Sequence, residues 1–262
     1  QDPKEMVDTL QRMNISMLFT IGGDGTLRGA QSIVDEIKRR GLAISVVAVP
    51  KTIDNDLQFT DRTFGFESAV YETFDVITAA HMEANGAHNG IGLVKLMGRD
   101  SGFIAAYASL ANSVVNICLI PEVPFTIEGE NGLLRAIERR WKQGKSHMVI
   151  VVAEGAGQDL IEGEDRYDAS GNLLKKDIGK FLVDKINAHF EKLGKEIHIK
   201  YFDPSYSIRS APAHGTDAIL CYQLAENAVH AAMSGRTACV VSQWDDTLVL
   251  VPIKMATLQR KK

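Results

Sequence analysis

The stretch "ISVVAVPKTIDND", Ile44–Asp56, joins an apolar run to a loop rich in charge. The run Ile44–Val49 is almost continuously apolar, which is typical of a strand covered on both faces, as in a parallel sheet between two layers of helices. The loop places Asp54 and Asp56 around Asn55, which we expect to shape the turn. A core gains nothing from two carboxylates. The stretch therefore predicts a parallel α/β sheet with polar chemistry at a strand end.

The same pattern recurs along the chain, where strand-like runs alternate with helical patterns. Further strands are predicted at Ile15–Ile21, Gly90–Met97, Val115–Ile120, His147–Ala153 and Ile197–Asp203. Helices are predicted at about Thr26–Arg40, Gly102–Ala111, Ile178–Leu193 and Thr216–Gly235. A turn is expected at Asp168–Asn172, and a β-hairpin is expected from Thr237–Gln243 and Thr247–Met255. The alternation predicts an α/β fold.

Composition limits the function classes. The 262 residues carry a net charge of −4, so there is no basic footprint for nucleic acid. No apolar stretch reaches the roughly 18 residues of a membrane helix, and the first residues, QDPKEM, do not form a signal peptide. We therefore expect a cytoplasmic protein that binds neither nucleic acid nor membrane. The histidines show no metal-ligand spacing.

Glycine and charged residues gather directly after four predicted strands. The loops are GGDGT (Gly22–Thr26), PKTIDND (Pro50–Asp56), MGRDSG (Met97–Gly102) and AEGAGQ (Ala153–Gln158). In open α/β sheets, ligands bind outside the carboxyl ends of the strands. Each loop alone could be a turn or a surface feature, but four such loops together favour a functional site at that edge.

GGDGT has the features of a phosphate cradle, because its glycines allow backbone N–H groups to approach an anion at a helix N-terminus. It matches neither the Walker A loop nor the dinucleotide G-x-G-x-x-G motif. It could instead be a tight strand–helix turn with Asp24 as a cap. Since a bare Asp24 would repel phosphate, a divalent cation is expected. Mg²⁺ is usually held by one or two carboxylates plus phosphates, so Asp24 and the aspartates of PKTIDND could share one ion.

With these motifs in order, and with TFGF (Thr63–Phe66), the Pro121-Glu122 pair and DPSYSIR (Asp203–Arg209), the chain resembles the phosphofructokinases over nearly its whole length. PKTIDND and MGRDSG are highly specific, whereas NAD kinases and lipid kinases share GGDGT. The residues of PKTIDND and MGRDSG are most similar to those of the plant and trypanosomatid branch. The resemblance implies two Rossmann-like, three-layer lobes with mostly parallel sheets, and an active site in the cleft at the strand C-terminal ends. Residues 1–65 plus 209–262 would form the phosphoryl-donor lobe, and residues 66–208 the sugar-phosphate lobe.

The resemblance implies phosphoryl transfer from ATP-Mg to the 1-hydroxyl of fructose 6-phosphate, giving fructose 1,6-bisphosphate. Asp54 would be the base, Thr52 would contact the phosphoryl group, and Arg99 would balance charge. Asp24 and Asp56 would hold Mg²⁺. Donor binding is implied for Gly22, Gly23, Asp24, Gly25, Thr26, Gly29 and Lys51. Substrate binding is implied for Thr52, Asp54, Met97, Gly98, Arg99, Glu154, Lys200, Tyr206 and Arg209.

Two residues bear on the identity of the phosphoryl donor, and they favour different donors. Gly25 stands where pyrophosphate-using relatives typically carry Asp, so glycine favours ATP. Lys51 before TIDND is also found in pyrophosphate users, so pyrophosphate stays the alternative donor.

Further interpretations of the chain stay open. The chain could be an inactive fragment of the same family. It could also be a regulatory subunit, which would be expected to lose Asp24 or Asp54, whereas both residues are present. It could also be an enzyme of the NAD-kinase or lipid-kinase type, which would leave PKTIDND and MGRDSG unexplained.

The resemblance also concerns assembly and extent. It implies a homo-oligomer, a dimer or tetramer, and a cytoplasmic or glycosomal compartment. It implies that the chain begins after the first strand and Gly-Gly-x-x-Pro-Gly-x-Asn loop of the family, and so is a large fragment of the enzyme. Gly90 stands where relatives usually carry a basic residue.

Overall fold

The computed structural model describes residues 2–167, 173–259 and 261. The chain divides into two compact units, with boundaries at Ser68/Ala69 and Pro212/Ala213. We call the part before and after these boundaries unit 1 and the part between them unit 2. The resemblance placed the boundaries at 65/66 and 208/209, and the donor and sugar-phosphate roles of the two units stay predictions. The expected turn at Asp168–Asn172 lies outside the described residues.

Unit 1 contains a four-stranded, mostly parallel sheet. Its strands, in spatial order, are β1 (Met17–Gly22), β2 (Ser45–Pro50), β9 (Cys239–Trp244) and β10 (Thr247–Pro252). β1 and β9 both run parallel to β2, and β10 is antiparallel to β9. The parallel arrangement predicted from the continuous apolar runs is therefore confirmed in this unit.

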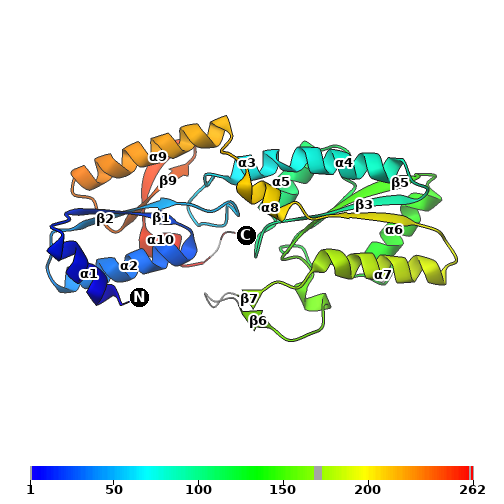
Figure 1. The fold of residues 1–262 in the computed structure, drawn as a ribbon, viewed down its shortest axis with the longest axis horizontal. Coiled ribbons are helices and arrows are strands. Elements are labelled where there is room, and N and C mark those ends of the chain that lie inside the picture. The colour runs from blue at the N-terminus through cyan, green and yellow to red at the C-terminus, as the bar shows by residue number, and fades with distance from the viewer. Residues whose placement is uncertain (1, 168–172, 260, 262) are drawn as a thin grey trace. The chain divides into compact units, whose positions relative to one another are not determined.

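Helices cover both faces of this sheet (Figure 1). They are α1 (Pro3–Arg12), α2 (Asp24–Arg39), α9 (Gly215–Met233) and α10 (Ile253–Ala256). Along β2, Val46 and Ala48 pack in the apolar cluster that holds α1, α2 and α10, whereas Val47 and Val49 pack with α9. These four consecutive residues thus meet helices on both faces of the sheet, which is why this part of the strand does not alternate apolar and polar residues.

The C-terminal hairpin forms as predicted, but its second strand is shorter. Asp245 and Asp246 have φ of 50° and 55°, the two positive values that a two-residue type I′ turn requires. The predicted strand to Met255 is wrong beyond Pro252, because proline cannot donate to the strand ladder. The chain turns there into α10, whose Ile253 is fully buried.

Unit 2 contains a second four-stranded sheet, and all of its strands are parallel. Their spatial order is β4 (Ile117–Leu119), β5 (His147–Ala153), β3 (Gly90–Leu96) and β8 (His198–Phe202). Each was predicted to within two residues at either end. A separate two-stranded sheet pairs β6 (Arg166–Tyr167) with β7 (Leu173–Leu174).

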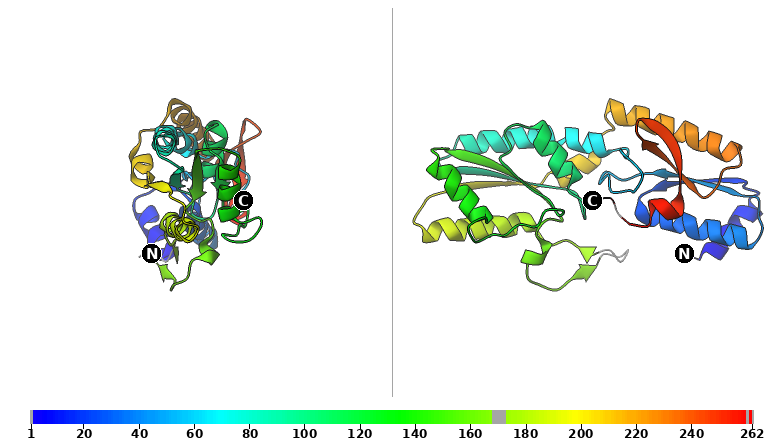
Figure 2. Two further views of the ribbon diagram at one scale, coloured as in Figure 1. Left: turned by 90° about the vertical axis from the view of Figure 1, so that its right-hand side faces the viewer. Right: turned by 180° about the vertical axis from the view of Figure 1, so that it is seen from behind.

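Two helix layers enclose the sheet of unit 2 (Figure 1), and Figure 2 shows them from behind. One layer holds α4 (Thr73–Asn85) and α5 (Phe103–Ala111), and the other holds α6 (Leu133–Lys142) and α7 (Ile178–Lys192). The shorter helices are α3 (Phe66–Tyr71), which contains the boundary at Ser68, the 3₁₀ turn Gln158–Leu160 and α8 (Ser205–Ser210). The sequence analysis did not predict α4 or α6.

Two glycines of β3 let α4 approach the sheet. A Cβ on Gly90 would lie 2.0 Å from the carbonyl oxygen of Ala84, and one on Gly92 would lie 2.5 Å from that of Ala80. Both partners are backbone atoms and cannot rotate away. Gly90 is therefore required by packing, and a basic side chain does not fit there.

Gly90→Ala is expected to lower the free energy of unfolding by about 1–3 kcal/mol, because the added methyl overlaps backbone in a packed layer. Gly29→Ala is the control, since a Cβ there meets nothing within 4 Å on helix α2. That variant should be neutral or more stable by about 0.5–1 kcal/mol. Chemical denaturation checks both, and an unchanged Gly90→Ala midpoint would contradict the packing role.

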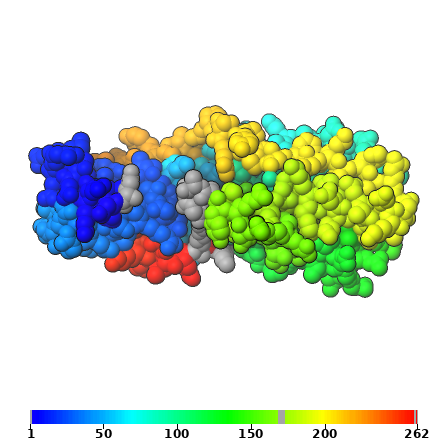
Figure 3. All heavy atoms as spheres, turned by 60° about the horizontal axis from the view of Figure 1, so that its bottom comes forward, coloured from blue at the N-terminus to red at the C-terminus, as the bar shows by residue number. Residues whose placement is uncertain are grey.

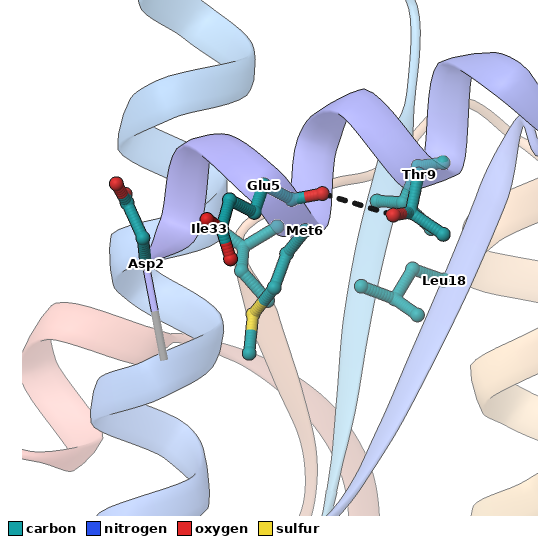
Figure 4. Close-up of a pocket in the computed structure, with 7 residues that line it drawn as sticks. Asp2, Glu5, Met6, Thr9, Leu18 and Ile33 are labelled. Atoms are coloured by element: carbon teal, nitrogen blue, oxygen red, sulfur yellow. Dashed lines mark hydrogen bonds between the residues drawn. The ribbon is translucent and has the colours of Figure 1, made fainter.

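Unit 1 carries a cavity of about 400 Å³ beside α1. Helix α1 lies at the surface (dark blue in Figure 3). The cavity is lined by Asp2, Glu5, Met6, Thr9, Leu10, Leu18 and Ile33 (Figure 4). Thr9 donates its hydroxyl to the Glu5 carbonyl oxygen within the helix. These lining residues include no residue of the predicted site. Among the described residues, no helix is long and apolar enough to span a membrane.

Candidate functional site

The two predicted loops of unit 1 leave neighbouring strands at the same point. Gly22 pairs with Pro50 in the parallel register of β1 and β2. Immediately beyond, the Lys51 N–H donates to the Gly22 carbonyl oxygen at 2.8 Å. GGDGT and PKTIDND therefore emerge side by side at the carboxyl edge of this sheet.

The four glycines predicted to bind the donor fall into two classes. A Cβ on Gly22 would lie 2.2 Å from the Thr26 hydroxyl, and one on Gly23 would lie 3.4 Å from the Lys51 carbonyl oxygen. Packing therefore requires glycine at position 22, whereas a Cβ on Gly23 would make only an ordinary van der Waals contact. Gly25 and Gly29 would meet nothing within 4 Å. Their side chains would point into open space, so packing in the chain itself does not require glycine at either position.

The start of α2 carries no side-chain cap. Gly23 is the N-cap residue, and Asp24 is the first helical residue, so Asp24 is not the cap that a simple strand–helix turn would need. The first-turn N–H groups of a helix lack intrahelical partners and can bind an anion. The Asp24 carboxylate instead accepts from Arg28, whose Nε lies 3.1 Å from both oxygens. Arg28 is well exposed, and such a surface pair costs little to break.

Asn55 holds the PKTIDND loop in shape. It is 2 % exposed and has a φ of 53°, a left-handed conformation that Asn tolerates better than most residues. Its Oδ1 accepts from the Thr63 N–H at 2.9 Å, and its Nδ2 donates to the Asp61 carbonyl oxygen at 3.0 Å. Thr63 also donates its hydroxyl to the Thr52 carbonyl oxygen at 2.5 Å. The TFGF segment thus braces the loop that carries the two carboxylates.

Thr52 links both carboxylate residues of this loop. Its hydroxyl accepts from the Asp54 N–H at 3.2 Å and donates to Asp56 Oδ1 at 3.4 Å. Asp56 is 7 % exposed, whereas Asp54 is only half-buried. Lys51 is exposed. Asp61 is also exposed, and its carboxylate accepts from the Asp245 N–H of the hairpin turn.

Asn55→Ala is expected to destabilise the protein by about 3 kcal/mol, because it removes the partner of the buried Thr63 N–H and forces alanine into a left-handed conformation. Asn55→Gly separates the two causes, since glycine adopts that conformation freely but cannot make the hydrogen bonds. It should cost less than Asn55→Ala. Thermal unfolding of the three proteins checks this, and equal melting temperatures would show that the brace contributes nothing.

Unit 2 brings its own pair of predicted loops together. Leu96 pairs with Ala153 at the ends of β3 and β5, and the Glu154 N–H donates to the Leu96 carbonyl oxygen at 2.8 Å. A Cβ on Gly155 would lie 2.3 Å from the Arg99 carbonyl oxygen. The MGRDSG and AEGAGQ backbones are therefore in direct contact. Arg99 and Glu154 consequently share one sheet edge.

Glu122 of the Pro-Glu pair has a structural contact in unit 2. Its Oε1 accepts from the Gly102 N–H at 2.8 Å, at the start of α5. This bond holds the end of the MGRDSG loop. In the same loop Met97 is only 3 % exposed, so its side chain presents little surface to a ligand.

The remaining predicted substrate residues lie on β8 and α8. Tyr206 is 86 % exposed, and Arg209, also exposed, follows three residues later on the same helix face. Lys200 is exposed on β8 and pairs with Gly92, four residues before the end of β3. At about 3.3 Å per residue, Lys200 lies about 13 Å back from that edge. The strand register therefore does not bring Lys200 to Arg99.

Several residues that shape these loops were not singled out from the sequence as site residues. Gly155 and Glu122 belong to quoted motifs, but their contacts depend on how neighbouring strands end. Lys95 stands in an otherwise apolar strand, and this isolated charge was a signal that could have identified it. Its contacts are described below.

The predicted metal carboxylates fit a magnesium ion by chemistry. Within the part of the chain that the structure describes, no three His, Cys, Asp or Glu side chains form a ready-made metal cluster. Asp24 and Asp56 instead come from loops that leave adjacent strands, and the Thr52 hydroxyl lies beside Asp56. Two carboxylates that leave the remaining positions to phosphate and water are the usual arrangement for Mg²⁺.

The family model described as "Phosphofructokinase" matches residues 1–232. The chain belongs to the phosphofructokinase family. It is 52 % identical over 266 residues to an ATP-dependent 6-phosphofructokinase from Borreliella burgdorferi, covering 99 % of this chain and 60 % of that relative. It is 52 % identical over 265 residues to the enzyme of the same name from Trypanosoma brucei brucei, covering 100 % of this chain and 53 % of the relative. The chain thus spans a little over half the length of these relatives.

Solved structures of the family share the fold. A pyrophosphate-dependent phosphofructokinase from Marinobacter aquaeolei superposes with a TM-score of 0.78 at 23 % identity, over 99 % of this chain and 64 % of that one. A Pichia pastoris phosphofructokinase superposes with a TM-score of 0.74 at 22 % identity, over 98 % of this chain and 28 % of that one. At these identities the likeness concerns the phosphofructokinase fold alone.

Proposed function

We propose that the intact protein transfers a phosphoryl group from ATP-Mg to the 1-hydroxyl of fructose 6-phosphate, the glycolytic reaction that yields fructose 1,6-bisphosphate. The observation that carries this proposal is the loop Thr52–Asp56. It holds two carboxylates beside a glycine-rich helix start, in a chain of the phosphofructokinase family. NAD-kinase or lipid-kinase chemistry would leave this loop and MGRDSG without a role.

On the donor side, the backbone at the start of α2 would bind phosphate oxygens, with Gly22, Gly23 and Thr26 shaping the turn. Lys51 would add a positive charge. Asp24 and Asp56 would hold Mg²⁺, which neutralises the charge of the donor phosphates when it is bound. On binding the ion, the Asp24 carboxylate would give up its ion pair with the exposed Arg28.

On the acceptor side, Asp54 would accept the proton of the attacking hydroxyl. Thr52 would contact the transferred group and Arg99 would balance its charge, as suits a reaction that depends mainly on positioning and electrostatics. Gly98, Glu154, Tyr206 and Arg209 would bind the sugar phosphate, together with Met97 through its backbone. Lys200 is the member of the predicted set that the strand register supports least.

We propose ATP as the donor for two reasons. The space around Gly25 is open, which leaves room for a nucleotide. The relatives at 52 % identity are named ATP-dependent, whereas the pyrophosphate-dependent structure is 23 % identical. Lys51 remains the feature that favours pyrophosphate.

A coupled assay of the intact protein tests the reaction and the donor together. With Mg²⁺ and fructose 6-phosphate, ATP is expected to support much faster turnover than pyrophosphate, and EDTA should abolish activity. Turnover with pyrophosphate alone would overturn the donor assignment. No turnover with either donor, while NAD or a diacylglycerol is phosphorylated, would overturn the reaction itself.

Assembly and compartment follow from the family resemblance alone. We propose a homo-oligomer, dimer or tetramer, in the cytoplasm, with the glycosome as the alternative compartment. Light scattering at working concentration tests the first proposal, because a monomeric active enzyme would contradict it. Cell fractionation tests the second.

A further inference from the structure

Lys95 places a charged group at the end of a buried apolar row in unit 2. Ile91, Leu93 and Lys95 alternate along β3 and so share one face of the sheet. Ile91 and Leu93 are fully buried in the apolar cluster with α6 and α7. The Lys95 side chain is only 14 % exposed. An ammonium group in such a place is costly unless carboxylates pair with it.

Two aspartates from different elements provide that pairing. The Lys95 Nζ lies 2.7 Å from Asp203 Oδ2 and 3.8 Å from Asp177 Oδ1. Asp177 precedes α7 as its N-cap, and Asp203 follows β8 directly. One side chain on β3 thus joins the start of α7 to the segment that leads into α8.

The Asp177 side of this network is firmly held. Its carboxylate accepts from the Tyr201 hydroxyl at 2.9 Å and from the Lys180 N–H at 3.2 Å. Burial, and then the hydrogen bond to Asp177, raises the pKa of Tyr201, so its hydroxyl stays a donor at neutral pH. The Tyr201 ring rests on Gly179, where a Cβ would lie 2.3 Å from the ring.

The Asp203 side controls the start of α8. Asp203 Oδ1 accepts from the Ser205 hydroxyl at 2.5 Å and from its N–H at 3.3 Å. Burial alone would raise the pKa of Asp203, but hydrogen bonds from Lys95 and Ser205 outweigh burial and keep that pKa below its usual range. The carboxylate is therefore ionised and bridges β3 to the first residue of α8.

Helix α8 needs an external anchor. It has six residues, too few to be stable on its own. Ile208 is its one buried residue, at 5 % exposure. Tyr206 and Arg209 project from it into solvent. The direction of these two side chains therefore depends on how the start of the helix is fixed.

We propose that Lys95 is a positioning residue for sugar-phosphate binding: through Asp203 it fixes the start of α8 and so directs Tyr206 and Arg209. The inference rests on the proposed function, because those two residues bind fructose 6-phosphate only if that function holds. Lys95 does not contact the ligand in this role. Its side chain has low exposure and is paired with two carboxylates, so Lys95 acts on the ligand site through Asp203.

The test compares Lys95→Met with Lys95→Arg and Lys180→Met in the intact protein. Lys180 also pairs with Asp177, at 3.6 Å, but its side chain is 74 % exposed, so it controls for loss of a lysine near the network. Lys95→Met should raise the KM for fructose 6-phosphate about tenfold and change the KM for ATP less than about twofold. Lys95→Arg should recover most of the loss, and Lys180→Met should match the parent protein.

Hydrogen exchange supplies a readout that does not depend on activity. In Lys95→Met, amide exchange over residues 203–210 should become faster, while exchange over β3 and β5 stays unchanged. Asp203→Asn should show the same loosening and the same KM effect. The double variant should be no worse than either single variant, because both remove one link.

The outcomes separate the two proposals. Unchanged exchange over α8 in both Lys95→Met and Asp203→Asn, or faster exchange with an unchanged KM for fructose 6-phosphate, overturns the positioning role. Additive losses in the double variant overturn the route through Asp203. If exchange rises as expected but the parent protein neither binds nor phosphorylates fructose 6-phosphate, the proposed function fails, and with it the link to sugar-phosphate binding.

Discussion

Asp54→Asn in the intact protein is expected to lower kcat by about 10²- to 10⁴-fold, the usual contribution of a general base, with little change in the affinity for fructose 6-phosphate. Asparagine keeps the size of the side chain but cannot accept the hydroxyl proton. The backbone bond from the Asp54 N–H to the Thr52 hydroxyl does not depend on the side chain, so the loop should keep its shape. Steady-state kinetics and direct sugar-phosphate binding check both parts.

The matched control is Asp61→Asn. Asp61 lies in the same segment and is exposed, and its carboxylate accepts a backbone N–H, which an asparagine oxygen can also do. Its activity should stay within about twofold of the parent protein. If kcat of Asp54→Asn fell by less than about tenfold, another group would have to accept the proton.

Gly25→Asp is expected to reduce kcat/KM for ATP by about thirtyfold. A new carboxylate about 8 Å from the α-phosphate of ATP, at an effective dielectric constant of about 20, costs about 2 kcal/mol, and pyrophosphate has no group at that place. Turnover with pyrophosphate, however low, should fall much less. Parallel assays with the two donors measure the ratio.

The fold should tolerate this substitution, which makes the kinetic result interpretable. A Cβ on Gly25 meets nothing within 4 Å, and an acidic residue in the first turn of α2 suits the helix dipole. Gly25→Ala is the control for size without charge and should keep most ATP activity. Equal losses with ATP and pyrophosphate in Gly25→Asp would contradict the role of this position in donor choice.

Strands buried on both faces could be predicted from the sequence because nearly every residue in them is apolar. β5 was predicted at His147–Ala153 with both ends correct, and β3 at Gly90–Met97 was one residue too long. Helix α6 was missed although Leu133, Leu134 and Ile137 give it helical spacing. The end of β10 was misplaced because its apolar run continues into α10, and only the proline marks the change.

The loops of the candidate site could be predicted because glycine and aspartate after a strand carry a recognisable chemistry. The contacts that hold these loops in place could not be predicted, because they depend on strand register and on contacts between segments far apart in the sequence. The pairing of Lys200 with Gly92 and the closeness of Gly90 to α4 follow from strand pairing and helix packing. A family motif assigns a residue type to a position, but only the three-dimensional packing shows which side chains have room.

The two open glycines of the α2 start also suit the protein to directed evolution. Gly22 is constrained by the Thr26 side chain, whereas a Cβ at position 25 or 29 of the helix meets no atom within 4 Å. A library randomised at those two positions would preserve folding in most members. Selection on such a library would report on donor chemistry almost alone, with few clones lost to misfolding.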